Sequence, residues 1–214
     1  MTEYHKIETL FERDKSTFVV NPMVLKSPVL ATISEWDVTE KIDGTNIRVK
    51  LSETGEVSFG GRTDAAQIPA DLIQHLIRTF QQDLLKSVLW LDPASPVDVV
   101  LYGEGYGAGI QKGGGLYRQD KSFILFDVLV AGKWWLDRIA VEEIAAKLGI
   151  DCVPYLGRMD LARIIDTVRS PFASRIGSAM AEGIVARPIE PLFDRHMKRI
   201  IIKLKTKDFI AGKR

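Results

Sequence analysis

Apolar and polar residues alternate on both sides of one Asp-Gly pair, and this pattern constrains the fold most. Residues 36–41 alternate up to Lys41, and residues 46–51 alternate again after Asp43-Gly44. A period of two predicts half-buried strands, and Asp-Gly between two such strands is the strongest short hairpin signal. We therefore predict one hairpin with Lys41 at the end of its first strand. A turn does not explain why Glu40 precedes this lysine and Asp43 follows it two residues later. A catalytic role for Lys41 is therefore a second interpretation.

The rest of the chain predicts an α+β fold built on antiparallel sheets, because strands outnumber helices and most are joined by short turns. Further strands are predicted from apolar or alternating runs at 57–60, 97–102, 123–130, 152–156, 182–186 and 200–204. Helical spacing predicts helices over 72–85, 138–148 and 161–168, with Asp137 as N-cap and Gly149 as the residue that stops the second. Residues 1–34 are expected to form a cover segment with a short helix near 7–12.

Length and composition indicate one domain, since 214 residues, 46% of them hydrophobic, can bury one sizeable core. The net charge is only +1, yet the last twenty residues hold eight Lys or Arg and a single acid, Asp208. Such local basic charge is typical of a phosphate-binding wall. One cysteine, Cys152, excludes an internal disulfide framework. With no signal peptide or spanning segment in the sequence, we expect a cytoplasmic protein.

The common nucleotide-binding and hydrolase motifs are excluded. The glycines from Gly103 to Gly109 alternate but give no GxGxxG, and neither Gly132-Lys133 nor Gly212-Lys213 continues as a P-loop. There is no HExxH or GxSxG, and three scattered histidines make a histidine metal site improbable. A nucleotide would have to bind by another route.

A nucleophilic lysine would supply such a route. Lysine attacks only as the free amine, and attack on phosphorus needs cations around the phosphate and a carboxylate-held divalent metal. Lys203 and Lys205 lie two apart in a predicted strand, so both side chains project to one face. A solvated strand edge explains the same row of lysines, because edge lysines discourage aggregation.

Four other residues are candidates, each with a structural alternative. Glu182 precedes a strand, where an isolated glutamate is usually a surface residue. Glu104 stands between two glycines, which would let a ligand approach the backbone. Phe126 is by default a core residue but could stack on a base, and Arg62 is either a turn residue or a bidentate anion donor.

Taken in order, several short motifs resemble those of the covalent nucleotidyltransferases, and most closely the ATP-dependent RNA ligases that include phage nick-sealing and RNA-editing enzymes. The motifs extend over residues 36 to 205 and read Glu40-Lys41-Ile42-Asp43-Gly44-Thr45-Asn46, Gly61-Arg62-Thr63, Tyr102-Gly103-Glu104-Gly105-Tyr106-Gly107, Phe123-Ile124-Leu125-Phe126-Asp127-Val128, Glu182-Gly183-Ile184-Val185-Ala186-Arg187 and Lys203-Leu204-Lys205. The resemblance implies an adenylylation domain of the nucleotidyltransferase type, with ATP and Mg²⁺ or Mn²⁺ as cofactors.

The resemblance also implies the reaction. Lys41 would form a lysyl-AMP phosphoramidate with ATP and release pyrophosphate. The AMP would then pass to the 5′-phosphate end of an RNA, and a 3′-hydroxyl would attack the adenylylated end to seal the break. An RNA with these two ends is the implied partner, and a nicked duplex is one form of it.

Individual roles follow from the same resemblance. Glu104 would hold the ribose hydroxyl, Phe126 would stack on adenine, and Glu182 would help place the metal. The remaining implied site residues are Lys203 and Lys205 at the α-phosphate, Arg62 at the ribose or phosphate, Asn46 at the phosphate and strand-joining site, and Glu40 and Ile42 beside the nucleophile, with Glu40 reading adenine through its backbone. Many RNA ligases of this branch have histidine where this chain has Asp43.

We expect residues 1–214 to form a single adenylyltransferase domain, with the catalytic motifs in 35–205 and no C-terminal OB-fold or helical domain. A separate partner could replace such a domain. Two alternatives stay open: a capping-type guanylyltransferase or minimal DNA ligase, and an inactive relative that only binds nucleic acid.

Overall fold

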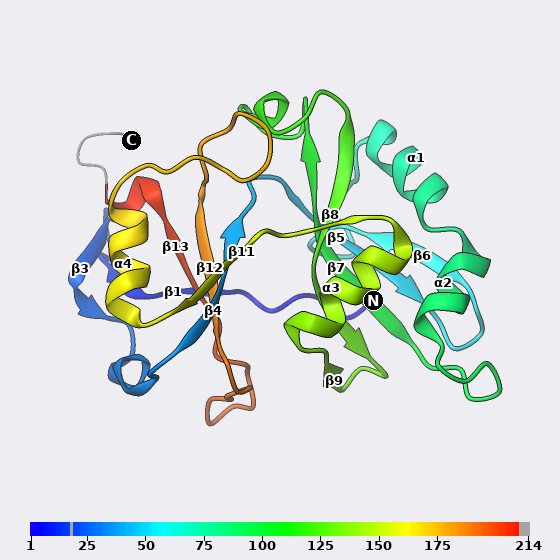
Figure 1. Cartoon of the computed structure of the whole chain (residues 1–214), viewed down its shortest axis with the longest axis horizontal. Helices are drawn as coiled ribbons and strands as arrows, with labels where there is room; N and C mark the ends of the chain where they lie inside the picture. Colours follow the sequence, from blue (N-terminus) through cyan, green and yellow to red (C-terminus); the bar gives the residue numbers. More distant parts are fainter. Residues whose placement is uncertain (18, 210–214) are drawn as a thin grey trace. The chain divides into compact units, whose positions relative to one another are not determined.

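The computed structural model describes residues 1–17 and 19–209, and it has the predicted α+β architecture (Figure 1). The chain divides into two compact units. Unit 1 consists of Met1–His5 and Asp43–Val153, and unit 2 consists of Lys6–Ile42 and Pro154–Arg214. The prediction that residues 1–214 form a single adenylyltransferase domain stays a prediction.

Unit 1 is built on a sheet with the strand order β10-β8-β7-β5-β6, and β9 pairs with β8. All its pairs are antiparallel except β10 with β8. Its strands are β5 (Thr45–Leu51), β6 (Val57–Gly60), β7 (Val99–Gly107), β8 (Lys121–Val130), β9 (Trp134–Trp135) and β10 (Asp151–Cys152). The predicted strand at 123–130 is confirmed as the buried β8, and residues 52–56 join β5 to β6.

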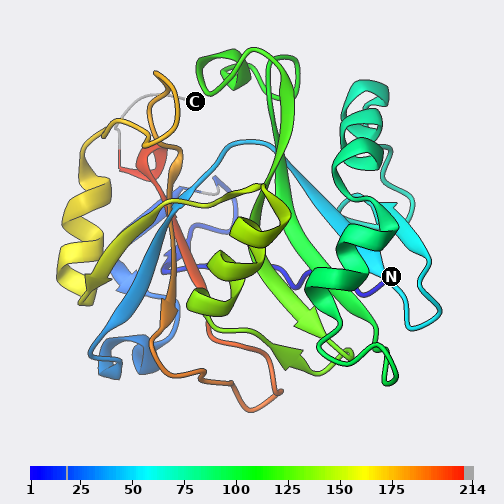
Figure 2. The same ribbon diagram turned by 45° about the vertical axis from the view of Figure 1, so that its right-hand side comes forward.

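The unit 1 helices pack on one face of this sheet and close its core. They are α1 (Ala70–Thr79), α2 (Gln82–Leu89) and α3 (Arg138–Leu148), with a short 3₁₀ turn, η2, at Gly114–Leu116. Figure 2 shows α2 and α3 next to each other, in agreement with their contacts. The apolar stripe predicted as one helix over 72–85 forms α1 and α2, because the backbone leaves the helical region at Phe80 and Gln81.

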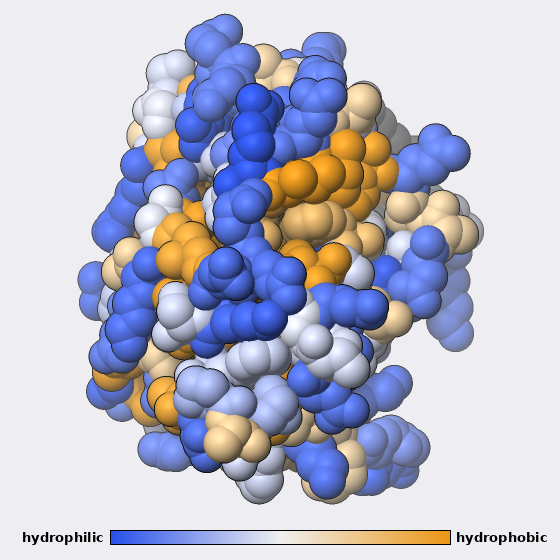
Figure 3. All heavy atoms as spheres, turned by 90° about the vertical axis from the view of Figure 1, so that its right-hand side faces the viewer, coloured by the Kyte–Doolittle hydropathy of each residue, from blue (hydrophilic) through white to orange (hydrophobic). Residues whose placement is uncertain are grey.

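The predicted ends of α3 are confirmed. Asp137 Oδ1 accepts a hydrogen bond from the Ala140 amide at 2.8 Å, and Gly149 has φ 65° at the C-terminal end. Figure 3 views the molecule from the side of α1, α2 and β6 and shows apolar patches among polar side chains. A hollow of about 630 Å³ on this face is lined by apolar side chains that include Ile73, Ile77 and Phe80.

Unit 2 contains a five-stranded sheet with the order β1-β13-β12-β4-β11 and a separate pair, β2-β3. Its elements are β1 (Glu8–Thr9), β2 (Phe11–Arg13), β3 (Val20–Leu25), η1 (Pro28–Thr32), β4 (Trp36–Lys41), β11 (Tyr155–Met159), α4 (Leu161–Arg169), β12 (Gly183–Pro188), β13 (Ile202–Lys205) and η3 (Thr206–Asp208). Trp36, Val38 and Ile184 form the centre of its core, against which α4 packs Ile164 and Val168.

The helix predicted near residues 7–12 is wrong. This stretch forms β1 and β2, because β1 pairs in parallel with the edge of β13, with Glu8 opposite Ile202. A short apolar pattern does not reveal such a partner, which lies almost the whole chain away. Residues 1–34 are also not one segment, since Met1–His5 belong to unit 1 and the others to unit 2.

The predicted hairpin around Asp43-Gly44 is also wrong. β4 pairs with β11 and β12, whereas β5 pairs with β6 and β7, so the two strands belong to different sheets. A type I′ turn needs positive φ at its glycine, and Gly44, a described residue, does not have it. Long-range pairing over six residues with β12 and seven with β7 outweighs the local turn signal.

The strand predicted at 152–156 likewise divides into β10 and β11, one in each unit. None of the helices in residues 1–17 and 19–209 has the length and apolar character needed to cross a bilayer.

Candidate active site

In unit 2, one carboxylate holds two lysines that are distant in sequence. Lys41 Nζ lies 2.5 Å from Glu182 Oε2, and Lys205 Nζ lies 2.5 Å from Glu182 Oε1. The Glu182 side chain is only 13% exposed, and both lysine side chains are less than a quarter exposed. The structure therefore brings together the predicted nucleophile, the predicted metal residue and one of the predicted phosphate-binding lysines.

The order of the strands explains why Glu182 contacts both lysines. β12 lies between β4 and β13, and Gly183 is opposite both Lys41 and Lys205. Gly183 has φ 156°, and a Cβ there would lie 2.0 Å from the Leu204 carbonyl oxygen, so no other residue fits without movement. The missing side chain at Gly183 therefore lets β12 lie close to the backbone of β13, directly after Glu182.

The electrostatics of this group favour an ionised glutamate. Burial raises the pKa of Glu182, but the Coulombic attraction of Lys41 and the hydrogen bonds from Lys205 and Lys41 outweigh it and leave the pKa below its ordinary value. One negative charge between two ammonium groups leaves a net positive site. Such a site would attract a phosphate.

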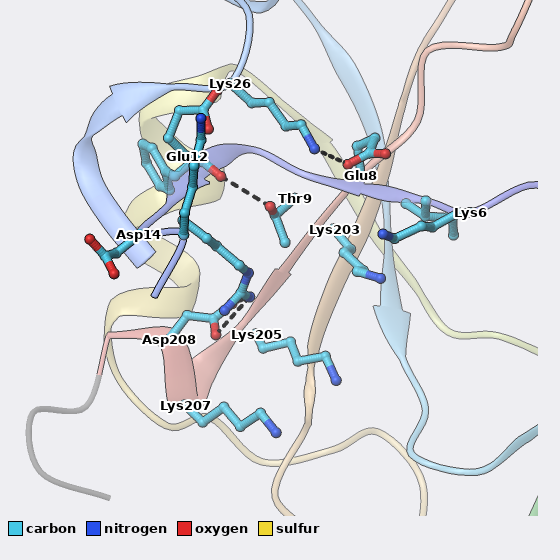
Figure 4. Close-up of a pocket in the computed structure, with 14 residues that line it drawn as sticks. Lys6, Glu8, Thr9, Glu12, Asp14, Lys26, Lys203, Lys205, Lys207 and Asp208 are labelled. Atoms are coloured by element: carbon cyan, nitrogen blue, oxygen red, sulfur yellow. Dashed lines mark hydrogen bonds and ion pairs between the residues drawn. The ribbon is translucent and has the colours of Figure 1, made fainter. Parts of the chain in front are cut away.

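Lys203 lies two residues before Lys205 on the same face of β13. Its neighbour across the sheet is Val185, which is in turn opposite Thr39. Figure 4 shows the side chains of Lys203, Lys205 and Lys207 leaving β13 and η3 in the same direction, and all three residues line a hollow of about 580 Å³. The prediction that Lys203 and Lys205 share a face is confirmed by the burial of Ile202 and Leu204 on the opposite face.

Glu40 is buried and uses its side chain to hold a loop. Its carboxylate accepts hydrogen bonds from the Ser174 hydroxyl and from the Arg175 amide, the latter at 2.9 Å. The Glu40 amide donates to Pro154 O at 2.9 Å, and Ile42 is buried. The sequence predicted only a backbone role for Glu40, which stays a prediction. The contact to the 174–175 loop was missed, because it is made 134 residues away.

In unit 1, Asn46 and Glu104 lie opposite each other on β5 and β7. A Cβ on Gly44 would lie 2.7 Å from Glu104 Cγ, so the glycine lets the β5 entry pass close to this glutamate. Asn46 Oδ1 is buried and has no hydrogen-bond partner among the described residues. A buried acceptor of this kind is a place where a ligand donor would be stabilised.

The glycines beside Glu104 have a different reason from the predicted one. A Cβ on Gly103 would lie 2.2 Å from the Phe123 ring, and one on Gly105 would lie 2.5 Å from Leu72 Cδ2. Both glycines therefore leave room for core side chains, not for a ligand.

Phe126 is half-buried and belongs to an aromatic cluster. It falls at an irregularity in the pairing of β7 with β8, and its ring meets the ring of Tyr4 edge to face, with the centroids 5.1 Å apart. The Tyr4 hydroxyl donates to Asp127 Oδ2 at 2.7 Å. The N-terminal residues thus cover part of the sheet face that carries Phe126, which the sequence did not reveal.

Arg48 is a buried arginine in β5. Its side chain is fully buried and donates to Gly61 O at 2.6 Å, to Met1 O at 2.7 Å and to Asp64 Oδ1 at 2.8 Å. The predicted anion donor Arg62 follows Gly61 and is exposed. Arg48 therefore fixes the bend that carries Arg62.

A multi-ligand metal site is not present in the part of the chain that the structure describes, since no three His, Cys, Asp or Glu residues are grouped to hold an ion. Glu182 offers one carboxylate, which is largely buried. Mg²⁺ commonly binds to one or two carboxylates and completes its shell with substrate phosphates and water, so this donor suits a metal that arrives with a nucleotide.

Comparison with solved structures supports the fold. A ligand-free mutant of a Naegleria gruberi RNA ligase is 20% identical, covers 85% of this chain and 53% of its own, and has a TM-score of 0.66. A mutant RNA ligase of that organism with ATP and Mn is 18% identical, with coverages of 96% and 56% and a TM-score of 0.67. The Naegleria gruberi RNA ligase with PPi is 18% identical, covers 96% of this chain and 62% of its own, and has a TM-score of 0.64.

This chain therefore spans between 53% and 62% of the length of these proteins. A comparison with curated proteins gives no match. The family comparison matches residues 34–205 to RNA ligase, over the same stretch that holds the motifs around Lys41, Glu104, Phe126, Glu182 and Lys205. Because that match covers most of the sequence, the chain belongs to the RNA ligase family.

Proposed function

We propose that this chain is an ATP-dependent RNA ligase that works through a covalent Lys41-AMP intermediate. The observation that carries the proposal is the group in which Glu182 pairs with both Lys41 and Lys205. A lysine alone is a poor nucleophile, whereas a lysine beside a carboxylate and a second cation has the groups that phosphoryl transfer needs.

In the first step, the Lys41 amine attacks the α-phosphorus of ATP. A nitrogen–phosphorus bond forms, and the bond from phosphorus to the bridging oxygen breaks, so that pyrophosphate leaves with that electron pair. Lys41 must lose protons to react and to end as a neutral phosphoramidate. Glu182 Oε2 is hydrogen-bonded to Lys41 Nζ and is the first acceptor. Beside the charged Lys41, the pKa of Glu182 lies below its ordinary value, so the carboxylate is ionised and able to accept this proton, which it then releases to solvent.

Lys205 and Lys203 supply positive charge on the face where the α-phosphate would lie. Preorganised cations stabilise charge that develops on phosphate oxygens in the transition state. Glu182 would also hold Mg²⁺ or Mn²⁺, which when bound neutralises phosphate charge and favours departure of pyrophosphate. The Naegleria RNA ligase structure with ATP and Mn supports this choice of nucleotide and metal.

Further roles are proposed for residues of unit 1. Glu104 would accept from a ribose hydroxyl, and the Phe126 ring would stack on adenine. Arg62 would contact the ribose or phosphate, and Asn46, with its buried Oδ1, would serve the phosphate and strand-joining chemistry. AMP would then pass to an RNA 5′-phosphate, and a 3′-hydroxyl would displace it to close the break.

Adenylylation with α-phosphate-labelled nucleotide tests the proposal. Wild type is expected to become covalently labelled by ATP in the presence of Mg²⁺, and both Lys41→Ala and Lys41→Arg should remain unlabelled. Lys50→Ala is the matched control, because Lys50 is another strand lysine with a carboxylate partner, Asp98, at 2.6 Å. Labelling of Lys41→Ala would overturn the nucleophile assignment, and preferential labelling by GTP would favour a capping-type enzyme.

A second assay separates ligation from adenylylation alone. The wild type should convert a 5′-phosphorylated RNA first to an adenylylated strand and then to a sealed product. Equal sealing of a DNA strand would favour the minimal DNA ligase.

A further inference from the structure

The hairpin between β12 and β13 is an ordered projection of unit 2. Phe193 bridges to Arg199, and Asp194 Oδ1 accepts from the amides of His196 at 2.8 Å and Lys198 at 2.9 Å. Met197 has φ 59°, an uncommon conformation for a residue other than glycine. Such a defined turn holds its side chains outward at little further entropic cost on binding.

The hairpin combines positive charge with exposed apolar surface. Arg195, His196 and Lys198 are exposed, as are Phe193 at 46% and Met197 at 77%. The only acid of the turn, Asp194, is used by the backbone, and its hydrogen bonds from the amides of Lys198 and His196 lower its pKa. A structural turn alone needs neither the cations nor the aromatic ring.

This hairpin borders the first of two adjoining hollows. The outer hollow has a volume of about 810 Å³ and is lined by the hairpin, by Ser27, Val29 and Leu30, and by residues 200–202. The inner hollow, of about 580 Å³, is the one that Lys203, Lys205 and Lys207 line (Figure 4). Glu8, Thr9 and Lys26 line both, so the two hollows lie next to each other.

Basic side chains follow both hollows from end to end. They define what we call the basic path: Arg195, Lys198, Arg199, Lys26, Lys6, Lys203, Lys205 and Lys207. Four acids also line the inner hollow: Glu8 pairs with Lys26, Asp208 Oδ2 lies 2.9 Å from the Arg13 guanidinium, Asp14 accepts from the Ser16 and Thr17 hydroxyls, and the fourth is the exposed Glu12. At its inner end, Lys205 is bound to the same Glu182 that holds Lys41.

We propose that the basic path binds an RNA strand, with the Phe193–Arg199 hairpin as its outer anchor. Successive cations match the repeated phosphates of a strand, and an exposed aromatic ring offers a stacking surface to an unpaired base. A pyrophosphate would need only a few of these cations and neither the ring nor the apolar wall of the outer hollow. The inference rests on the proposed function, because it names how the RNA substrate reaches Lys41.

The test compares two double variants of equal charge change. Arg195→Gln/Lys198→Gln removes two exposed cations from the hairpin. Arg163→Gln/Arg169→Gln removes two exposed cations from α4, which lines neither hollow. Binding of a fluorescein-labelled, 5′-phosphorylated single-stranded RNA is followed by anisotropy over a range of salt concentrations.

The hairpin variant should bind this RNA about tenfold more weakly. The slope of the logarithm of the binding constant against the logarithm of the salt concentration should fall in magnitude by about 1.4, since each phosphate contact to a single strand contributes about 0.7. The α4 variant should match wild type. Phe193→Leu, which keeps the apolar contact but removes the ring, should weaken binding about tenfold with an unchanged salt slope.

Lys41 adenylylation, measured without RNA, should be equal in all these variants. Equal RNA affinity in the hairpin variant and wild type, or an equal loss in the α4 variant, would overturn the proposal. Loss of inorganic pyrophosphate binding with intact RNA binding would assign the path to the leaving group instead. A wild type that binds RNA through the hairpin but is never adenylylated would contradict the proposed function and leave the RNA path standing.

Discussion

The ammonium group of Lys41 lies 2.5 Å from Oε2 of Glu182, although 141 residues separate the two in the chain. This contact joins the end of β4 to the residue before β12. It holds the predicted nucleophile in one position, beside the carboxylate that we propose as the acceptor for its proton.

The first prediction concerns this pair and pH. Glu182→Gln should destabilise the protein by about 2 kcal/mol at neutral pH, because two charged hydrogen bonds are weakened and two ammonium groups face each other. The pKa of Glu182 lies below the ordinary value of 4.5, so the advantage of wild type is complete above pH 4.5. It should disappear as the pH falls through the folded-state pKa.

Urea denaturation of both proteins as a function of pH measures this difference. Other carboxylates titrate equally in the two proteins, so the difference in unfolding free energy isolates Glu182. A difference that grows on acidification would contradict the ion pair.

The second prediction concerns Gly183. Gly183→Ala should lower the unfolding free energy by about 2 kcal/mol or more, since the new Cβ would meet the Leu204 carbonyl and strain the backbone. Gly113→Ala is the control, because nothing lies within 4 Å of its added Cβ and its φ is −98°. Equal midpoints for the two variants in chemical denaturation would show that β12 and β13 do not need to approach so closely.

The third prediction concerns the buried carboxylate of Glu40. Glu40→Gln replaces an acceptor oxygen by a donor, which leaves the Ser174 hydroxyl or the Arg175 amide unsatisfied, at a cost of about 1–3 kcal/mol. The Arg175 amide should then exchange its hydrogen faster, as measured by hydrogen exchange and mass spectrometry. The exposed Glu53 provides the control variant, Glu53→Gln. Unchanged protection at Arg175 would rule out this anchoring.

The fourth prediction separates stability from chemistry in unit 1. Arg48→Lys should destabilise the fold by about 3 kcal/mol, because one ammonium cannot replace three directed guanidinium bonds at a buried site. Arg62→Ala should leave the melting temperature nearly unchanged but lower the rate of adenylylation. A loss of stability in Arg62→Ala, together with slower adenylylation but normal stability in Arg48→Lys, would mean that Arg62 supports the fold and Arg48 supports the reaction.

Much of the fold could be predicted from local sequence. Alternation identified β4 and β5, continuous apolarity identified the buried β8, and Asp137 with Gly149 marked both ends of α3. These signals succeed because periodicity and capping depend on residues within one or two turns. The same local signals failed at Asp43-Gly44 and near residues 7–12, where the partner strand lies far along the chain.

The sequence by itself determined the family, since the ordered motifs around Lys41, Glu182 and Lys205 lie in the stretch that matches RNA ligase. Only the tertiary structure decided that one carboxylate joins both lysines, because that depends on β12 lying between β4 and β13 and on the close approach of β12 to β13 at Gly183. Strand order is set by the packing of side chains over the whole unit, and no local pattern records it.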